Sequence, residues 1–179
     1  VGMDFFTVPT VTFKLLWVFF VIRHDRRRVV HFAVTEYAMT SWIVQCLREA
    51  FPFDARPRFA VLDRDGKYGS EVPKALRRIG TEPIRCAYRS PWQNSVAERW
   101  IGSVRRELLD HVVVLNADHL TRLLSSFVGY YNRTRCHLGV DKDSPEGRVP
   151  SFKPSTPATI VAFPEVGGLQ HRYEWKAAA

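Results

Sequence analysis

Several features that would identify common classes of small protein are scarce in this chain of 179 residues. It has only three cysteines, Cys46, Cys86 and Cys136, which are far apart and odd in number. This excludes a disulfide framework and a cysteine zinc site, and it favours a reducing compartment. The six histidines show no ligand-like pairing. No apolar run reaches the roughly 18 residues that a membrane helix needs, and no signal peptide is visible, so we expect no membrane partner.

Positive charge is what the sequence has in excess. The 26 Lys and Arg residues outnumber the 18 Asp and Glu residues, which gives a net charge of +8 and a pI near 9.8. A hydrophobic content of 46% is typical of a globular protein. The length suits one α/β domain with an appendage. The charge favours a polyanionic partner such as nucleic acid.

Hydrophobic patterning predicts an alternation of strands and helices. Strands are expected near residues 2–8, 13–22 and 28–35, and the polar turn 24–27 makes the last two a hairpin. Thr40 or Ser41 could cap a helix that ends at Phe51. The remaining expected elements are a strand at 58–63, a short helix near 71–79, a strand near 83–88, a loop at 90–93 and helices over about 94–111 and 117–132.

This order predicts an α/β fold. A hairpin-linked antiparallel trio extended by two crossover-linked strands gives a mixed five-stranded sheet with helices on both faces, as in a ribonuclease H-like domain. The continuous apolar run at 13–22 predicts a central strand. Five of the eleven prolines lie beyond Asn132. We therefore expect a core domain over residues 1–137 and an extended Pro-rich C-terminal arm over 138–179.

Three acids stand where a metal site could form. Asp4 lies inside the first strand, Asp63 ends the strand 58–63, and Glu98 lies near the start of the helix 94–111. Phosphoryl transfer between DNA oxygens needs charge neutralisation and a deprotonated nucleophile, which two divalent ions about 3.5–4 Å apart supply. Carboxylates are ligands that Mg²⁺ prefers. We predict that the three acids are catalytic and bind two Mg²⁺ (or Mn²⁺) ions, with Asp4 between them.

The chain resembles the integrase catalytic core of bacterial insertion-sequence transposases and retroviral-type integrases over roughly residues 2–150. The residues that carry the resemblance are Asp4 in Met-Asp-Phe-Phe, Asp63 with Gly66 and Tyr68, the stretch 94–98 with Arg105 and Glu107, and the stretch 130–137, where Cys136 replaces a common proline. The resemblance implies metal-dependent DNA strand cleavage and strand transfer. It also implies double-stranded DNA as the partner (element ends and target), a homo-oligomer in the active complex, and a cytoplasmic, nucleoid-associated bacterial protein.

The second acid of the site has an alternative. The family usually has Asp-x-Gly at this point, whereas here the sequence is Asp63-Arg64-Asp65-Gly66. Counting back five residues from Tyr68 selects Asp63, and Asp65 is the other reading.

Several residues around the acids are predicted to contact DNA. Glu98 and Arg105 lie two turns apart on one helical stripe, so Arg105 could hold a phosphate, although a solvated helix face is the competing interpretation. The other predicted DNA contacts lie around the loops that flank the site and are Lys67, Arg89, Gln93 and Asn94. Two functional alternatives stay open: a ribonuclease H-like nuclease without strand transfer, and an inactive DNA-binding remnant of a mobile element.

Overall fold

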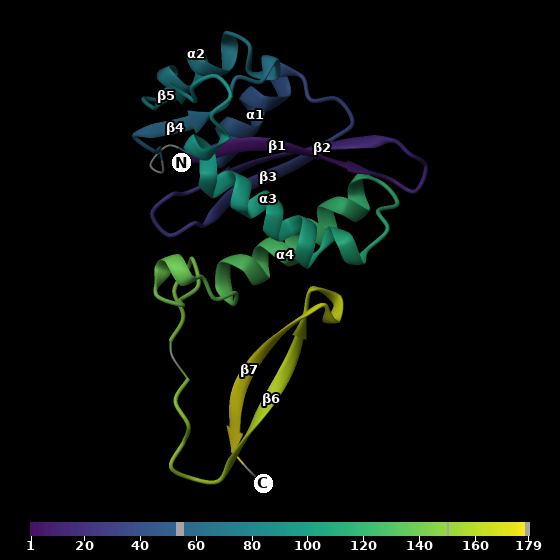
Figure 1. Cartoon of the computed structure of the whole chain (residues 1–179), viewed down its shortest axis with the longest axis vertical. Helices are drawn as coiled ribbons and strands as arrows, with labels where there is room; N and C mark the ends of the chain where they lie inside the picture. The colour runs from purple at the N-terminus through teal and green to yellow at the C-terminus, as the bar shows by residue number, and fades with distance from the viewer. Residues whose placement is uncertain (53–55, 150, 178–179) are drawn as a thin grey trace. The chain divides into compact units, whose positions relative to one another are not determined.

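The computed structural model describes residues 1–52, 56–149 and 151–177. Their contacts divide the chain into two compact units, residues 1–121 and residues 122–179. Figure 1 traces the elements of both. The boundary predicted after residue 137 stays a prediction. No helix in these ranges is long and apolar enough to cross a membrane.

The first unit is built on a five-stranded sheet with the order β3-β2-β1-β4-β5. Its strands are β1 (Gly2–Pro9), β2 (Leu15–Ile22), β3 (Val29–Thr35), β4 (Phe59–Leu62) and β5 (Glu82–Arg85). Strands β1, β2 and β3 pair antiparallel, whereas β1, β4 and β5 pair parallel. The predicted mixed sheet is therefore confirmed.

Helices cover both faces of this sheet, as Figure 1 shows for α1 and α3. The regular helices are α1 (Thr40–Ala50), α2 (Glu71–Arg78), α3 (Ser95–Glu107) and α4 (Ala117–Arg133), of which α4 crosses the boundary between the two units. Single 3-10 turns lie at η1 (Gly66–Tyr68), η2 (Pro91–Asn94) and η3 (Leu109–His111).

The pleat of β1 decides which face each of its side chains joins. Met3 belongs to the core between the sheet and helices α1 and α2. Phe6 lies on the opposite face, with its ring centroid 5.8 Å from that of Trp100 in α3, and Phe20 of β2 packs 4.1 Å from the same indole. Successive side chains of a strand alternate between faces. Asp4 therefore belongs to the α3 face.

Some predicted bounds of the strands and helices were wrong. The second strand begins at Leu15 rather than at residue 13, because Phe13 has φ of +61° in the turn before it. Its predicted interior position is confirmed, because it lies between β1 and β3, with β1 as the middle strand of the sheet. Helix α3 ends at Glu107 rather than near 111, because Leu108 leaves helical geometry (φ −133°, ψ −63°).

Two local predictions between the strands also need correction. Neither Thr40 nor Ser41 caps α1: the N-cap position is Met39, and the Thr40 hydroxyl donates to the carbonyl of Lys67 over 2.9 Å. The expected loop at 90–93 is largely the 3-10 turn η2, which starts at Pro91. The fixed φ of proline suits a first helical position, which explains why the segment coils.

The second unit contains two strands that the sequence did not predict. β6 (Ala158–Glu165) and β7 (Gln170–Ala177) form an antiparallel pair across the turn η5 (Val166–Gly168), and the turn η4 (Leu138–Val140) precedes them. Arg172 lies over the Phe163 ring at 4.7 Å and pairs with Glu165 at 3.4 Å. The expected extended arm is thus in part a two-stranded sheet.

Candidate active site

The site begins where the pairing of β1 with β4 stops. Among the described residues, these two parallel strands pair at one position, Gly2 with Val61. Beside it, the Val61 N–H donates a hydrogen bond to the Val1 carbonyl. Backbone groups alternate in direction along a strand. The Met3 carbonyl and the Phe5 N–H therefore face the side on which β4 no longer pairs.

Side chains complete the hydrogen bonds that the missing strand pairing leaves open. The Met3 carbonyl accepts from the Tyr68 hydroxyl at 3.3 Å and from Asn94 Nδ2 at 3.2 Å. The Phe5 N–H donates to Asp4 Oδ1 at 2.8 Å. Buried backbone groups require such partners. Asp4 is consequently held by its own strand.

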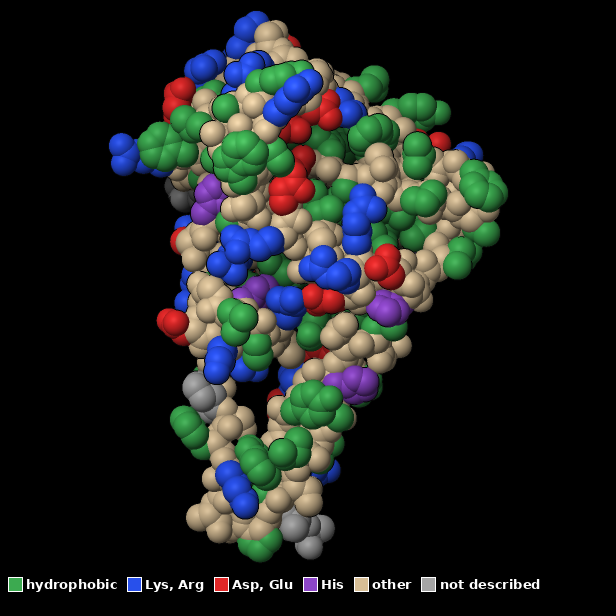
Figure 2. Space-filling view, viewed as in Figure 1, with side chains coloured by type: hydrophobic (Ala, Val, Ile, Leu, Met, Phe, Trp, Pro, Cys, Tyr) green, Lys and Arg blue, Asp and Glu red, His purple; other side chains and the backbone are tan. Residues whose placement is uncertain are grey.

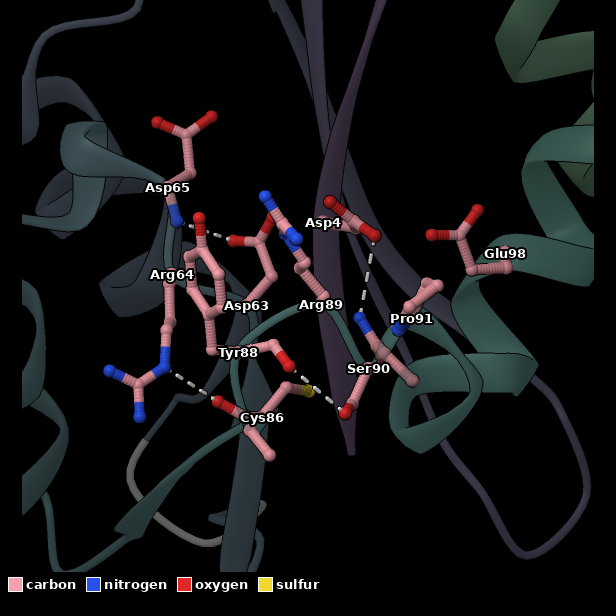
Figure 3. A pocket seen from close by; sticks show the side chains of 12 residues that line it. Asp4, Asp63, Arg64, Asp65, Cys86, Tyr88, Arg89, Ser90, Pro91 and Glu98 are labelled. Carbon is pink, nitrogen blue, oxygen red and sulfur yellow. Dashed lines mark hydrogen bonds between the residues drawn. The ribbon is translucent and has the colours of Figure 1, made fainter.

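An open cavity of about 390 Å³ lies at this place and brings the three predicted acids together. Asp4 comes from β1, Asp63 follows β4, and Glu98 lies in the first turn of α3 (Figure 3). Asp4 is only 8% exposed, Asp63 is half-buried, and Glu98 is exposed. On the face shown in Figure 2, acidic side chains gather in a hollow with Lys and Arg side chains around it.

Burial raises the pKa of Asp4 to about 7, and the negative charges of Asp63, Glu98 and Asp65 add to this shift. The hydrogen bond from the Phe5 N–H opposes it. An acid whose ionised form is disfavoured by neighbouring acids is stabilised in that form by a cation. The electrostatics of the cavity thus favour a bound positive charge.

The donors that line the cavity suit a hard divalent cation. The acids offer only oxygen ligands, which Mg²⁺ and Mn²⁺ prefer. In the ranges that the structure describes, no three His, Cys, Asp or Glu side chains stand close enough together to hold a metal ion as they are placed. The oxygen ligands that these residues offer fit the predicted cofactor, and Glu98 lines the same cavity as Asp4 with an exposed side chain.

Asp63 and Asp65 differ in how their oxygens are used. Asp65 caps η1 by accepting from the Lys67 N–H at 2.8 Å, and its other oxygen pairs with Lys67 Nζ at 2.8 Å. Among the described residues, Asp63 accepts one hydrogen bond, from the Asp65 N–H at 2.9 Å. In Figure 3 the Asp63 carboxylate lies nearer to Asp4, whereas that of Asp65 points away. This arrangement favours Asp63, and its role as a ligand stays a prediction.

Of the predicted DNA contacts, two line the cavity. Arg89 is exposed there, with φ of +53°. Asn94 is 3% exposed, and its Nδ2 lies 3.4 Å from Asp4 Oδ2. Gln93 braces the loop instead, because its Oε1 accepts from the Ala87 N–H at 2.6 Å.

The other two lie outside the cavity. Lys67 is engaged with Asp65 and lies 4.0 Å from the centroid of the Trp17 ring. Arg105 lines a separate groove beside Thr7 and Val113. The stripe that it was predicted to share with Glu98 therefore does not bring the two side chains into one cavity. Contact of these residues with DNA stays a prediction.

Arg64 is a cavity residue that sequence reasoning missed. Its Nε donates to the Cys86 carbonyl at 3.0 Å, which ties the residue after Asp63 to the end of β5. Tyr88 and Ser90 also line the cavity, and the Ser90 hydroxyl donates to the Tyr88 carbonyl at 3.2 Å. The signal for Arg64 was its position directly after a strand-ending acid.

Comparison with known proteins is consistent with this geometry. Residues 79–145, which include Glu98 but neither Asp4 nor Asp63, match the family described as integrase core domain. Among curated proteins, none matches the sequence.

Three solved structures are similar in fold. The first is a chain of the simian T-cell lymphotropic virus intasome in complex with PP2A regulatory subunit B56 gamma, with a TM-score of 0.64, 15% identity and 98% of this chain covered. The present chain spans 66% of that chain's length. The HTLV-2 integrase catalytic core domain has a TM-score of 0.61 and 9% identity, with 81% of this chain and 91% of that chain covered. The BIV integrase catalytic core domain has a TM-score of 0.56 and 14% identity, with 81% of this chain and 90% of that chain covered.

The resemblance to integrase catalytic cores predicted from the sequence is thereby confirmed, by a sequence match over residues 79–145 and by the fold.

Proposed function

We propose that this chain is the catalytic domain of a DNA transposase or integrase, which cleaves a DNA strand in a metal-dependent step and then joins the freed 3′-hydroxyl to target DNA. The observation that carries the proposal is the convergence of Asp4, Asp63 and Glu98, from three separate elements, on one cavity. That cavity lies in a fold shared with retroviral integrase catalytic cores.

Each acid has a distinct place in the proposed mechanism. Asp4, Asp63 and Glu98 would hold two Mg²⁺ or Mn²⁺ ions. When bound, these ions supply charge neutralisation at phosphorus and lower the pKa of the attacking water or hydroxyl group. Asp4 is fixed on the sheet by the Phe5 N–H. Glu98 reaches the cavity from a helix and is exposed. The HTLV-2 relative was solved in complex with magnesium, which supports this cofactor.

Arginines at the cavity would orient the DNA. Arg64 is fixed through its Nε to the Cys86 carbonyl, which leaves its terminal nitrogens for other partners. Arg89 is exposed in the same cavity. Guanidinium groups suit phosphate oxygens because they can donate two parallel hydrogen bonds. The two residues would hold phosphate oxygens of the strand that is cut.

Double-stranded DNA and further copies of the chain are the proposed partners. The net charge of +8 suits a polyanion. Two DNA ends must be held together for concerted joining, which requires at least a dimer. One relative belongs to an intasome and another was solved in a trimeric form, which supports assembly.

The test is an assay with labelled duplex DNA ends, incubated with Mg²⁺ and the protein. We expect nicked strands and, with target DNA present, joined products of greater length. Asp4→Asn, Asp63→Asn and Glu98→Gln serve as matched controls, because each removes a ligand oxygen at nearly constant volume. Hydrolysis without joined products would instead indicate a nuclease, and no reaction would indicate a DNA-binding remnant.

A further inference from the structure

The buried amide of Asn94 lies behind Asp4 and has a use beyond lining the cavity. Its Nδ2 lies 3.2 Å from the Met3 carbonyl and 3.4 Å from Asp4 Oδ2. Asn94 is 3% exposed. These two contacts join the turn η2, directly before the helix that carries Glu98, to the strand that carries Asp4. An amide placed in this way restrains the second oxygen of the acid, while the Phe5 N–H restrains the first.

The other end of this amide is confined as well. Asn94 Oδ1 is buried and has no hydrogen-bond partner within the described part of the chain. A Cβ placed on Gly2 would come within 2.6 Å of this oxygen and within 2.9 Å of His24 Nε2. The imidazole of His24 and the orphan oxygen thus both border the space that the missing side chain of Gly2 leaves open.

The charge state of His24 suits a donor to that oxygen. Burial lowers the pKa of His24, so its ring is neutral at pH 7 and carries one N–H. A buried amide oxygen without a partner is costly, and an N–H donated by His24 would remove that cost. With Nε2–H directed at Oδ1, the amide could not turn over, and its Nδ2 would stay directed at Asp4.

We propose that Asn94 is the positioning residue of Asp4, with His24 fixing the direction of its amide and Gly2 providing the room for both. The inference rests on the proposed function, since its purpose is to orient the buried acid for a divalent ion. It assigns Asn94 a role other than the DNA contact predicted from the sequence. Partners behind a metal ligand typically change metal affinity or activity by about 10–100-fold when they are removed.

The experiment measures Mn²⁺ binding by electron paramagnetic resonance in the full chain and in variants. We expect Asn94→Ala to raise the Kd for Mn²⁺ about tenfold, and Gly2→Ala to do the same by pushing the amide aside. In the double variant Gly2→Ala/Asn94→Ala the clash with the amide is gone and only the close approach to His24 remains, so the Kd should be close to that of Asn94→Ala alone. His24→Ala should weaken binding by a smaller factor.

Two controls separate positioning from a structural role. Ser103 is another buried polar residue on α3, 8% exposed, and it does not line the cavity. Ser103→Ala should leave the Kd unchanged, and the midpoint of urea unfolding should be similar in this variant and in Asn94→Ala. In the strand-cleavage assay, Asn94→Ala should lower kcat while the KM for DNA stays the same.

The outcomes distinguish this inference from the proposed function. Mn²⁺ binding by Asp4→Asn equal to that of the unmodified chain would overturn the metal site, and the inference with it. Loss of binding in Asp4→Asn with an unchanged Kd in Asn94→Ala would overturn the inference alone. An additional loss when Gly2→Ala is combined with Asn94→Ala would show that Gly2 acts through something other than Asn94, and an unchanged Kd in His24→Ala would remove His24 from the arrangement.

Discussion

The central strand β1 pairs with its two neighbouring strands over very different lengths. It pairs with β2 at every position from Gly2 to Pro9, whereas among the described residues it pairs with β4 at one position, Gly2 with Val61. The continuous ladder satisfies the backbone on one side. On the other side, the polar groups of Met3 and Phe5 turn to Tyr68, Asn94 and Asp4. The candidate site thus occupies the place where strand pairing ends.

The largest expected effect comes from changing the acids on the open side. Asp4→Asn, Asp63→Asn and Glu98→Gln should each reduce Mg²⁺-dependent cleavage about a thousandfold or more, because each removes a hard ligand without changing volume. Circular dichroism should show an unchanged fold. Asp65→Asn is the matched control and should retain most activity, since Asp65 is occupied with Lys67. Loss of activity in Asp65→Asn with retention in Asp63→Asn would reverse the assignment.

On the paired side, the expected effect is on stability. Phe20 of β2 is fully buried against Trp100. Phe20→Ala should lower the free energy of unfolding by about 3–5 kcal/mol, because it leaves a cavity in the core. Urea unfolding monitored by tryptophan fluorescence measures this. A loss below about 1 kcal/mol, within the range of surface substitutions, would show that this face is not the tightly packed one.

Stability without metal should depend on pH through Asp4. Its pKa is about 7 in the folded state and near 3.8 when unfolded, so the folded state holds the proton more tightly. Protonated Asp4 therefore contributes about a few kcal/mol to the free energy of unfolding. This contribution is complete below pH 4 and is lost as the pH rises through 7. Urea unfolding in EDTA at pH 5 and pH 8 should show this fall. Asp4→Asn should reduce it, and Mg²⁺ should restore stability at pH 8. An equal fall in Asp4→Asn would assign it to another group.

The smallest expected effect concerns Arg105, which lies away from the acids in its own groove. If it holds a DNA phosphate, Arg105→Ala should make the negative slope of log affinity against log salt concentration shallower by about 0.9. Arg89→Ala, at the cavity, should change the slope similarly and also lower the cleavage rate. Fluorescence anisotropy with labelled duplex at several salt concentrations measures both. An unchanged slope for Arg105→Ala would leave it as a solvated residue of the helix face.

Much of the fold followed from the sequence because hydrophobic periodicity is a local signal. The apolar run at 15–22 and the stripe of α3 around Trp100 specify burial without knowledge of their partners. The strands β6 and β7 were missed because all of their described side chains are half-buried or exposed and Pro164 interrupts the pattern. Proline is unusual within a strand except at an edge, so this segment was read as extended.

The candidate site was only partly predictable for a related reason. Asp4, Asp63 and Glu98 could be named because each belongs to a recognisable element: Asp4 lies inside the first strand, Asp63 ends a strand and Glu98 lies near the start of a helix. The roles of Arg64 and Asn94 depend on hydrogen bonds to Cys86 and Asp4, which lie 22 and 90 positions away. No local pattern encodes such pairs. Likewise, the position of Glu98 and Arg105 on one helical stripe does not predict that their side chains line different cavities.

The pairing of Asp65 with Lys67 has a consequence for charge balance. Because the ammonium neutralises Asp65, the cavity presents the formal charge of three acids rather than four. Two divalent ions would exceed these three negative charges by one positive charge, which a single DNA phosphate would cancel. If the fourth acid were free, the four acids would already balance the two ions, and only Arg64 and Arg89 would attract the phosphate. The Asp65–Lys67 pair would thus leave the acids and ions with one positive charge for the substrate, to which Arg64 and Arg89 add.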